Sequence, residues 1–221
     1  MTLHSHLPLY GHDTSWESRW DQARRIIASV APKVAQYSPY GIDLHFLNRA
    51  TFYSDLHTER EVQEAFNAVT PAKGTPTGIR VNDILDAYMC TLRYYRDLIP
   101  LNLLILTDGE ANDEEILHWT IVEHLTNLIH RGYHPHQLGI EFVQVGDCMK
   151  ATRQLVKLEV DVNRHFKRDV IGVTPINQTS NINPDLLLAI AASGIHARIK
   201  GYMRPPRINR DGYCNGDIMM K

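Results

Sequence analysis

Residues 101–113 read LNLLILTDGEAND, an apolar run that stops abruptly in a polar turn. A nearly continuous apolar run is typical of a central strand that is covered on both faces, as in a parallel sheet between helices. In open α/β sheets the ligand crevice lies outside the carboxyl ends of the strands. Asp108 and Glu110 follow this strand directly, so we expect them at that edge, and Asp108 is the first candidate site residue.

The polar turn after this strand also has a purely structural interpretation. Gly109 would turn the chain, and Asn112 or Asp113 would cap the helix that follows. We expect Asp113 to act as such a cap.

Composition and charge describe one globular domain without a strong electrostatic preference. The chain has 221 residues, of which 43% are hydrophobic, and a net charge of −2 that favours neither nucleic acid nor an anionic membrane. No apolar run approaches the length of a membrane span, and residues 1–10 lack the features of a secretory signal. Cys90, Cys148 and Cys214 are odd in number and far apart, which fits a reducing compartment. We therefore expect a cytoplasmic protein that binds neither nucleic acid nor membranes.

The apolar periodicity alternates between helices and strands. Helical spacing occurs in residues 16–34, 59–69, 81–95, 121–129, 151–162 and 186–199. Strand patterns occur in residues 40–48, 101–106, 139–146 and 169–176, with a short edge strand at 51–56. This order predicts an α/β fold with a Rossmann-like, mostly parallel sheet and helices on both faces. Residues 1–15 are then an irregular lead-in, residues 16–200 the domain, and residues 201–221 a disordered tail.

A second polar loop, residues 74–78 with the sequence GTPTG, precedes a predicted helix. Such a loop and the end of a neighbouring strand lie at the same edge of the sheet, so Thr75 and Asp108 are expected to approach one another. Hydroxyl and carboxylate oxygens are the hard ligands that Mg²⁺ prefers. The alternative, that Thr75 and Thr77 only cap the following helix, stays open.

Four segments in this order resemble the von Willebrand factor A domain family, especially its intracellular fungal-type members: residues 74–78, 106–110, 139–146 and 184–188. The resemblance covers roughly residues 16–199. In that family a metal-ion-dependent adhesion site holds a divalent cation, usually Mg²⁺. Its ligands come from a DxSxS motif after the first strand, a threonine in a Gly-Thr loop and an aspartate that ends the fourth strand. By resemblance, Thr75 matches the threonine and Asp108 the aspartate.

The family's first motif is altered in this chain. Residues 13–17 read DTSWE, which keeps Asp13 and Ser15 but has Glu17 where the family has its second serine. The resemblance therefore implies an incomplete magnesium site whose ligands are Asp13, Ser15, Thr75 and Asp108.

The family's first strand, which lies between the strands corresponding to residues 42–47 and 101–106, also has no clear equivalent. Residues 7–12 could fill this position, the two flanking strands could pair directly, or the sequence could come from a truncated gene model. Pro8 argues against the first explanation because proline cannot donate a hydrogen bond to a central ladder. We expect truncation.

The resemblance implies a non-catalytic protein-interaction domain that uses the carboxyl edge of its sheet, with or without Mg²⁺. In the complete family site an acidic residue of the partner completes the metal's coordination. A second possibility is a phosphate- or nucleotide-binding Rossmann-like enzyme that holds an anion with residues 74–78 and the following helix N-terminus. The chain contains no GxxxxGK[ST], GxGxxG or GxSxG motif to support it. A metal-free scaffold is a third possibility, favoured by the altered DxSxS motif.

Overall fold

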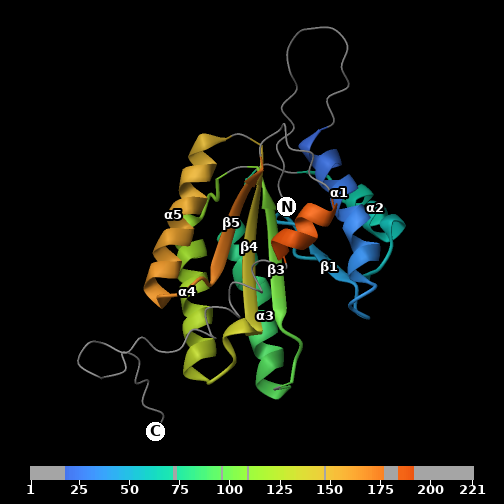
Figure 1. Ribbon diagram of the computed structural model, residues 1–221. Coiled ribbons are helices and arrows are strands. Elements are labelled where there is room, and N and C mark those ends of the chain that lie inside the picture. The colour runs from blue at the N-terminus through green and yellow to red at the C-terminus, as the bar shows by residue number, and fades with distance from the viewer. Residues whose placement is uncertain are drawn as a thin grey trace, which may run out of the picture.

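Figure 1 presents a computed structural model of the chain, which describes residues 18–71, 74–95, 97–108, 110–146, 148–176 and 184–191. Its elements are α1 (Arg19–Val34), β1 (Ile42–His45), β2 (Phe52–Leu56), α2 (Glu59–Asn67), α3 (Thr77–Tyr94), β3 (Leu101–Thr107), α4 (Glu114–His130), η1 (Pro135–Gln137), β4 (Leu138–Val145), α5 (Met149–Phe166) and β5 (Ile171–Ile176). Residues 184–191 are also helical. The predicted lead-in and tail lie outside the described residues.

The main sheet is parallel and has the strand order β3-β4-β5. Its register places Leu101 opposite Leu138, and Ile140 opposite Ile171. β4 lies in the middle and is buried at all of its positions. β1 and β2 form a separate antiparallel pair.

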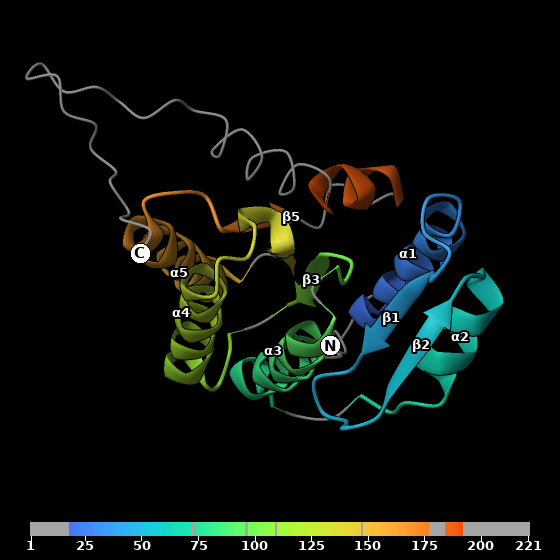
Figure 2. The same ribbon diagram turned by 90° about the horizontal axis from the view of Figure 1, so that it is seen from below.

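Helices cover both faces of the parallel sheet, as Figure 2 shows. Alternate residues of β3 point to opposite faces, because side chains along a strand alternate. Ile105 packs into the core formed with α3, α4 and α5, whereas Leu106 packs into the core formed with α1, α2 and the helical residues 184–191. This two-sided burial explains the continuous apolar run and confirms the predicted α/β class with a parallel sheet flanked by helices.

The pair β1–β2 is joined to the rest of the domain by packing of side chains. Phe46, which follows β1, stacks edge-on with Phe66 of α2 and lies in the same core as Ile26 of α1 and Leu106 of β3. Among the described residues, β1 pairs with β2 and β3 pairs with β4, so direct pairing between the strands that flank the expected first strand is not observed. Residues 7–12, the other segment considered for this position, lie outside the described part of the chain.

None of the helices in the described part of the chain combines the length and the apolar character needed to cross a membrane.

Candidate functional site

The loop before α3 and the loop after β3 meet at the carboxyl edge of the parallel sheet. The backbone N–H of Thr75 donates to the side-chain oxygen of Asn112, and the backbone N–H of Asn112 donates to the carbonyl oxygen of Thr75 over 3.0 Å. Thr75 and Asp108 are each only 3% exposed. The structure thus joins the two loops that carry the predicted ligands Thr75 and Asp108.

Asp113 caps a helix, but a different one from the helix predicted. Its carboxylate accepts hydrogen bonds from the backbone N–H groups of Gly78, over 3.0 Å, and Ile79, over 2.9 Å, in the first turn of α3. It makes no side-chain capping bond to α4, the helix that follows it in sequence, so the prediction for Asp113 was wrong in this respect. The alternative that Thr75 or Thr77 caps α3 with its hydroxyl group is also wrong, since α3 has no side-chain cap of its own.

A close approach between α3 and α4 explains why Asp113 caps α3 instead of α4. A Cβ atom added to Gly78 would lie 2.5 Å from the backbone nitrogen of Leu117 in α4. The missing side chain brings the start of α3 against the residues that precede α4, within reach of the Asp113 carboxylate. Local sequence contains no signal for a contact that depends on two helices packing together.

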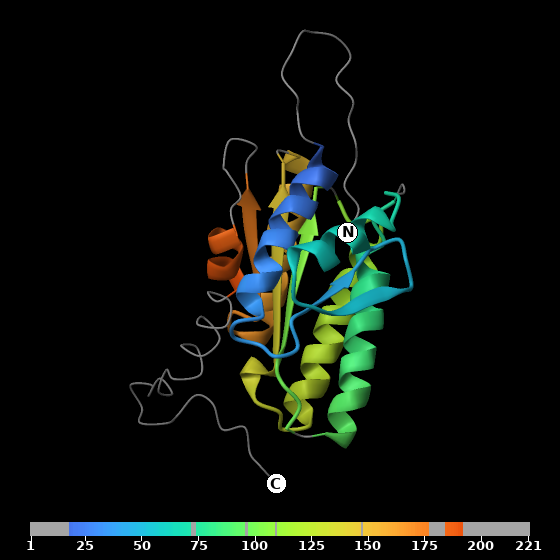
Figure 3. The ribbon, with the colours of Figure 1, turned by 90° about the vertical axis from the view of Figure 1, so that its right-hand side faces the viewer.

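Asp108 faces a cation supplied by the protein itself. Arg19, the first residue of α1, places its Nη1 atom 3.4 Å from Oδ2 of Asp108, and the two side chains are 22% and 1% exposed. The Arg19 guanidinium also lies on Gly146, where an added Cβ would be only 2.8 Å from its Cζ atom. The start of α1 therefore covers the edge to which the strands β3 and β4 point (Figure 3).

Sequence reasoning did not identify Arg19 as part of the site. Arg19 begins an amphipathic helix whose charged residues look like an ordinary solvated face. It reaches Asp108, 89 positions away in the sequence, only through the tertiary fold.

The described residues do not by themselves fit a magnesium site. Thr75 and Asp108 come from joined loops, whereas Asp13 and Ser15, the other two predicted ligands, lie outside the described residues. Among the residues with defined placement, no group of three or more His, Cys, Asp or Glu side chains could hold a metal ion. The guanidinium of Arg19 lies 3.4 Å from Oδ2 of Asp108 and offsets its charge, so a divalent cation at this carboxylate would compete with it.

The loop after β3 is also fixed to α5. The side chain of Gln154 binds both the N–H and the C=O of Ala111, over 2.8 and 3.2 Å, and donates a third hydrogen bond to Glu114 over 3.0 Å. This last bond lowers the pKa of the Glu114 carboxyl, with a smaller contribution from Lys157. Glu110 pairs with Lys150 over 2.7 Å. The loop is therefore held from two sides, by the start of α3 and by α5.

Apolar side chains surround this edge on its outer side. Ile79, Ile116 and Met149 lie in the first turns of α3, α4 and α5 and are 52%, 43% and 63% exposed. Aromatic side chains are also exposed at the far end of α3, where Tyr94 and Tyr95 follow one another. Exposed apolar area alone therefore does not distinguish the two ends of the sheet.

Comparisons with models of protein families, with curated proteins and with solved structures found nothing that matches this chain.

Proposed function

We propose that this protein is a non-catalytic protein-interaction domain that contacts its partner with the carboxyl edge of the parallel sheet. The observation that carries the proposal is the fixed geometry of the loop after β3, which is hydrogen-bonded to the loop before α3 on one side and to Gln154 of α5 on the other. A surface that is already ordered loses less conformational entropy when a partner binds. The exposed side chains of Ile79, Ile116 and Met149 supply apolar area around it.

In this proposal the chain is an altered von Willebrand factor A-like domain, as the resemblance in residues 74–78 and 106–110 suggests. The metal-free form has the better support, because Arg19 balances the charge of Asp108. An acidic residue of the partner would then meet a guanidinium at this edge in place of a metal ion. We place the protein in the cytoplasm, which agrees with its free thiols at Cys90 and Cys148.

The alternative of a phosphate-binding enzyme has weaker support at this edge. An anion held by the start of α3 would use the backbone N–H groups there. Gly78 and Ile79 already donate theirs to Asp113, and Thr75 donates its own to Asn112. A phosphate group would have to displace these two side chains.

Photo-crosslinking from defined positions tests the proposal. A photoreactive amino acid would replace Ile79 or Met149 at the carboxyl edge, and Tyr94 or Tyr95 at the opposite end as matched exposed controls. In cells that make the protein, the two edge positions should crosslink the same protein and the two control positions should not. Equal crosslinking from both ends, or none from the edge, would contradict the proposal.

The role of the metal is tested on the crosslinked pair. We expect the complex to persist when divalent cations are removed with a chelator, and to weaken when Arg19 is replaced by Gln. Loss of the complex on chelation, with recovery on addition of Mg²⁺, would instead support the metal-dependent form.

A further inference from the structure

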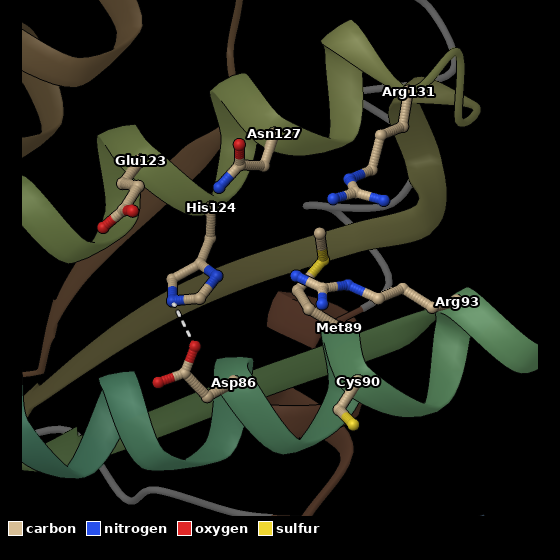
Figure 4. A pocket seen from close by; sticks show the side chains of 8 residues that line it. All are labelled: Asp86, Met89, Cys90, Arg93, Glu123, His124, Asn127 and Arg131. Atoms are coloured by element: carbon tan, nitrogen blue, oxygen red, sulfur yellow. Dashed lines mark ion pairs between the residues drawn. The ribbon is translucent and has the colours of Figure 1, made fainter.

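A pocket of about 250 Å³ lies between α3 and α4 (Figure 4). Its lining side chains stand one and two turns apart on two facing helices, the spacing that places residues on one side of a helix. The pocket is lined by Asp86, Met89, Cys90 and Arg93 from α3, by Glu123, His124 and Asn127 from α4, and by Arg131, which follows α4. The pocket is therefore built from two elements and does not belong to the interaction edge described above.

Two positive charges stand at one end of this pocket. Arg93 lies in the last turn of α3, and Arg131 is the residue at which α4 ends. Figure 4 shows both guanidinium groups on the same side of the pocket, beside Met89. Neither forms an ion pair with a carboxylate within the described ranges. The dipoles of the two helix C-termini offset part of this positive charge, and the carboxylates of Asp86 and Glu123 lie on the opposite side of the pocket (Figure 4). An anion between the two arginines would receive charge-assisted hydrogen bonds from both.

A buried histidine points into the same pocket. The side chain of His124 is only 5% exposed, and its Nε2 atom lies 3.4 Å from the side-chain oxygen of Asn82 and 3.7 Å from Oδ1 of Asp86. Both neighbours accept hydrogen bonds, so Nε2 carries the proton of the neutral ring and Nδ1 is left as an acceptor. Nδ1 is buried and has no hydrogen-bond partner among the described residues. Figure 4 shows it directed away from Asp86, toward the space beside Asn127.

The protonation state of His124 follows from its surroundings. Burial lowers the pKa of its imidazole, and the nearby carboxylates of Asp86 and Glu123 offset part of this effect. A neutral ring needs a donor at Nδ1, because an unsatisfied buried polar atom is unfavourable. A bound molecule that carries a hydroxyl group would supply that donor.

We propose that this pocket binds a small phosphate monoester that carries a free hydroxyl group. Its phosphate would lie between Arg93 and Arg131, and its hydroxyl would donate to Nδ1 of His124. A phosphate monoester carries nearly two negative charges at neutral pH, which matches the two guanidinium groups better than a single carboxylate does. The volume is below the range of roughly 300–1,000 Å³ for sites of drug-sized ligands, which favours a small molecule over a segment of another protein.

Isothermal titration calorimetry on the full chain tests this site with glycerol 3-phosphate as the probe. We expect saturable binding of one molecule per chain. Arg93→Gln and Arg131→Gln should each weaken it by about tenfold or more, because each removes a charged hydrogen-bond donor from the phosphate. Arg153→Gln is the matched control, since Arg153 is exposed on α5 and does not line the pocket. Absence of saturable binding, or equal weakening by all three variants, would overturn the proposal.

The role of His124 is tested by changing the ligand rather than the buried residue. Propyl phosphate keeps the charge and the carbon chain of the probe but has no hydroxyl group. It should bind the unmodified protein about three to ten times more weakly, as expected for the loss of one hydrogen bond. Equal affinity for the two phosphates would exclude the hydroxyl contact. Tighter binding of a phosphoserine peptide than of glycerol 3-phosphate, through the same two arginines, would overturn the assignment to a small molecule.

Discussion

Gly78 allows α3 and α4 to touch, and its replacement tests how tightly this contact is packed. A Cβ atom at Gly78 would lie 2.5 Å from the backbone nitrogen of Leu117 and 2.9 Å from its Cα atom, so the two helices would have to move apart. We expect Gly78→Ala to lower the free energy of unfolding by roughly 1–3 kcal/mol, the usual cost of overpacking. Urea denaturation measures this change.

The control for Gly78 adds one heavy atom to an exposed position of the same helix. Ala87→Ser should change the free energy of unfolding by only about 0.5 kcal/mol or less. Similar values for the two variants would show that α3 and α4 are not in close contact at Gly78.

His124 should make the stability of the protein sensitive to weak acid. Burial lowers the pKa of His124 in the folded state below the ordinary value for a histidine. As the pH falls below that ordinary value, the imidazole of His124 becomes protonated in the unfolded chain but stays neutral in the folded chain. The free energy of unfolding therefore decreases. We expect His124→Gln to reduce this decrease, as measured by urea denaturation between about pH 7.5 and 5.5.

His165 provides the comparison, because it is exposed at the end of α5. His165→Gln should leave the pH dependence of the wild-type chain unchanged. If both replacements changed the pH dependence of the free energy of unfolding equally, the burial of His124 would not be the cause of that dependence.

The start of α3 depends on a side chain from outside that helix. Asp113 accepts hydrogen bonds from two backbone N–H groups of α3, and its negative charge lies at the positive end of the helix dipole. We expect Asp113→Ala to destabilise the protein by about 1–2 kcal/mol, comparable to the loss of a good N-cap, and to expose the first turn of α3 to proteolysis. Thermal unfolding and limited digestion measure the two effects.

Two related substitutions test whether the loss of stability in Asp113→Ala comes from the lost helix cap. Asp113→Asn keeps one acceptor oxygen but loses the charge, so its stability should fall between that of the wild type and that of Asp113→Ala. Glu115→Ala removes an exposed carboxylate from the first turn of α4 and should have little effect. A larger loss from Glu115→Ala than from Asp113→Ala would contradict the cap across the two helices.

At the level of helices and strands, the sequence predicted much of what the structure shows. The continuous apolar run in β3 and the helical spacing of apolar residues in α5 follow directly from which side chains are buried. Both elements lie where they were expected. The helix starts were less accurate. α3 begins at Thr77, before Val81, which is its first buried apolar side chain and the start of the predicted helix, because Asp113 and Gly78 stabilise a first turn that periodicity does not reveal.

The ion pair between Arg19 and Asp108 connects the two halves of the whole domain, since α1 packs with α2 and shares a core with the pair β1–β2, while Asp108 directly follows β3 of the parallel sheet. We expect Arg19→Gln to cost roughly 1–3 kcal/mol, because the Asp108 carboxylate is buried while the guanidinium keeps partial access to water. A double-mutant cycle with Asp108→Asn should give a coupling energy of at least about 0.5 kcal/mol.

Arg24 supplies a control for this cycle on the same helix. It pairs with Asp21 over 2.7 Å, but the two side chains are 36% and 42% exposed. Arg24→Gln should therefore change stability by less than about 1 kcal/mol. A coupling energy near zero for Arg19 and Asp108 would show that their contact does not hold the two halves together.

The composition of the candidate site was harder to predict than the fold. The sequence placed Thr75 and Asp108 on two loops of one sheet edge, because the ends of parallel strands converge there. It could not indicate that Arg19 would stand beside Asp108, or that Arg93, His124 and Arg131 would share a pocket. Each of these is a polar residue within or at the end of a helix, and only the packing of whole helices determines which polar side chains meet.

The complete burial of β4 makes this strand a reporter for the entire molecule. Its backbone amides are hydrogen-bonded between β3 and β5 and covered by helices on both faces, so they can exchange with deuterium only when the sheet opens as a unit. The slowest exchange rates in β4 therefore measure the free energy of global unfolding. A ligand that binds only the folded chain must slow these rates further, by an amount that its concentration and dissociation constant determine. Deuterium uptake at β4 can thus detect any such molecule, wherever on the surface it binds.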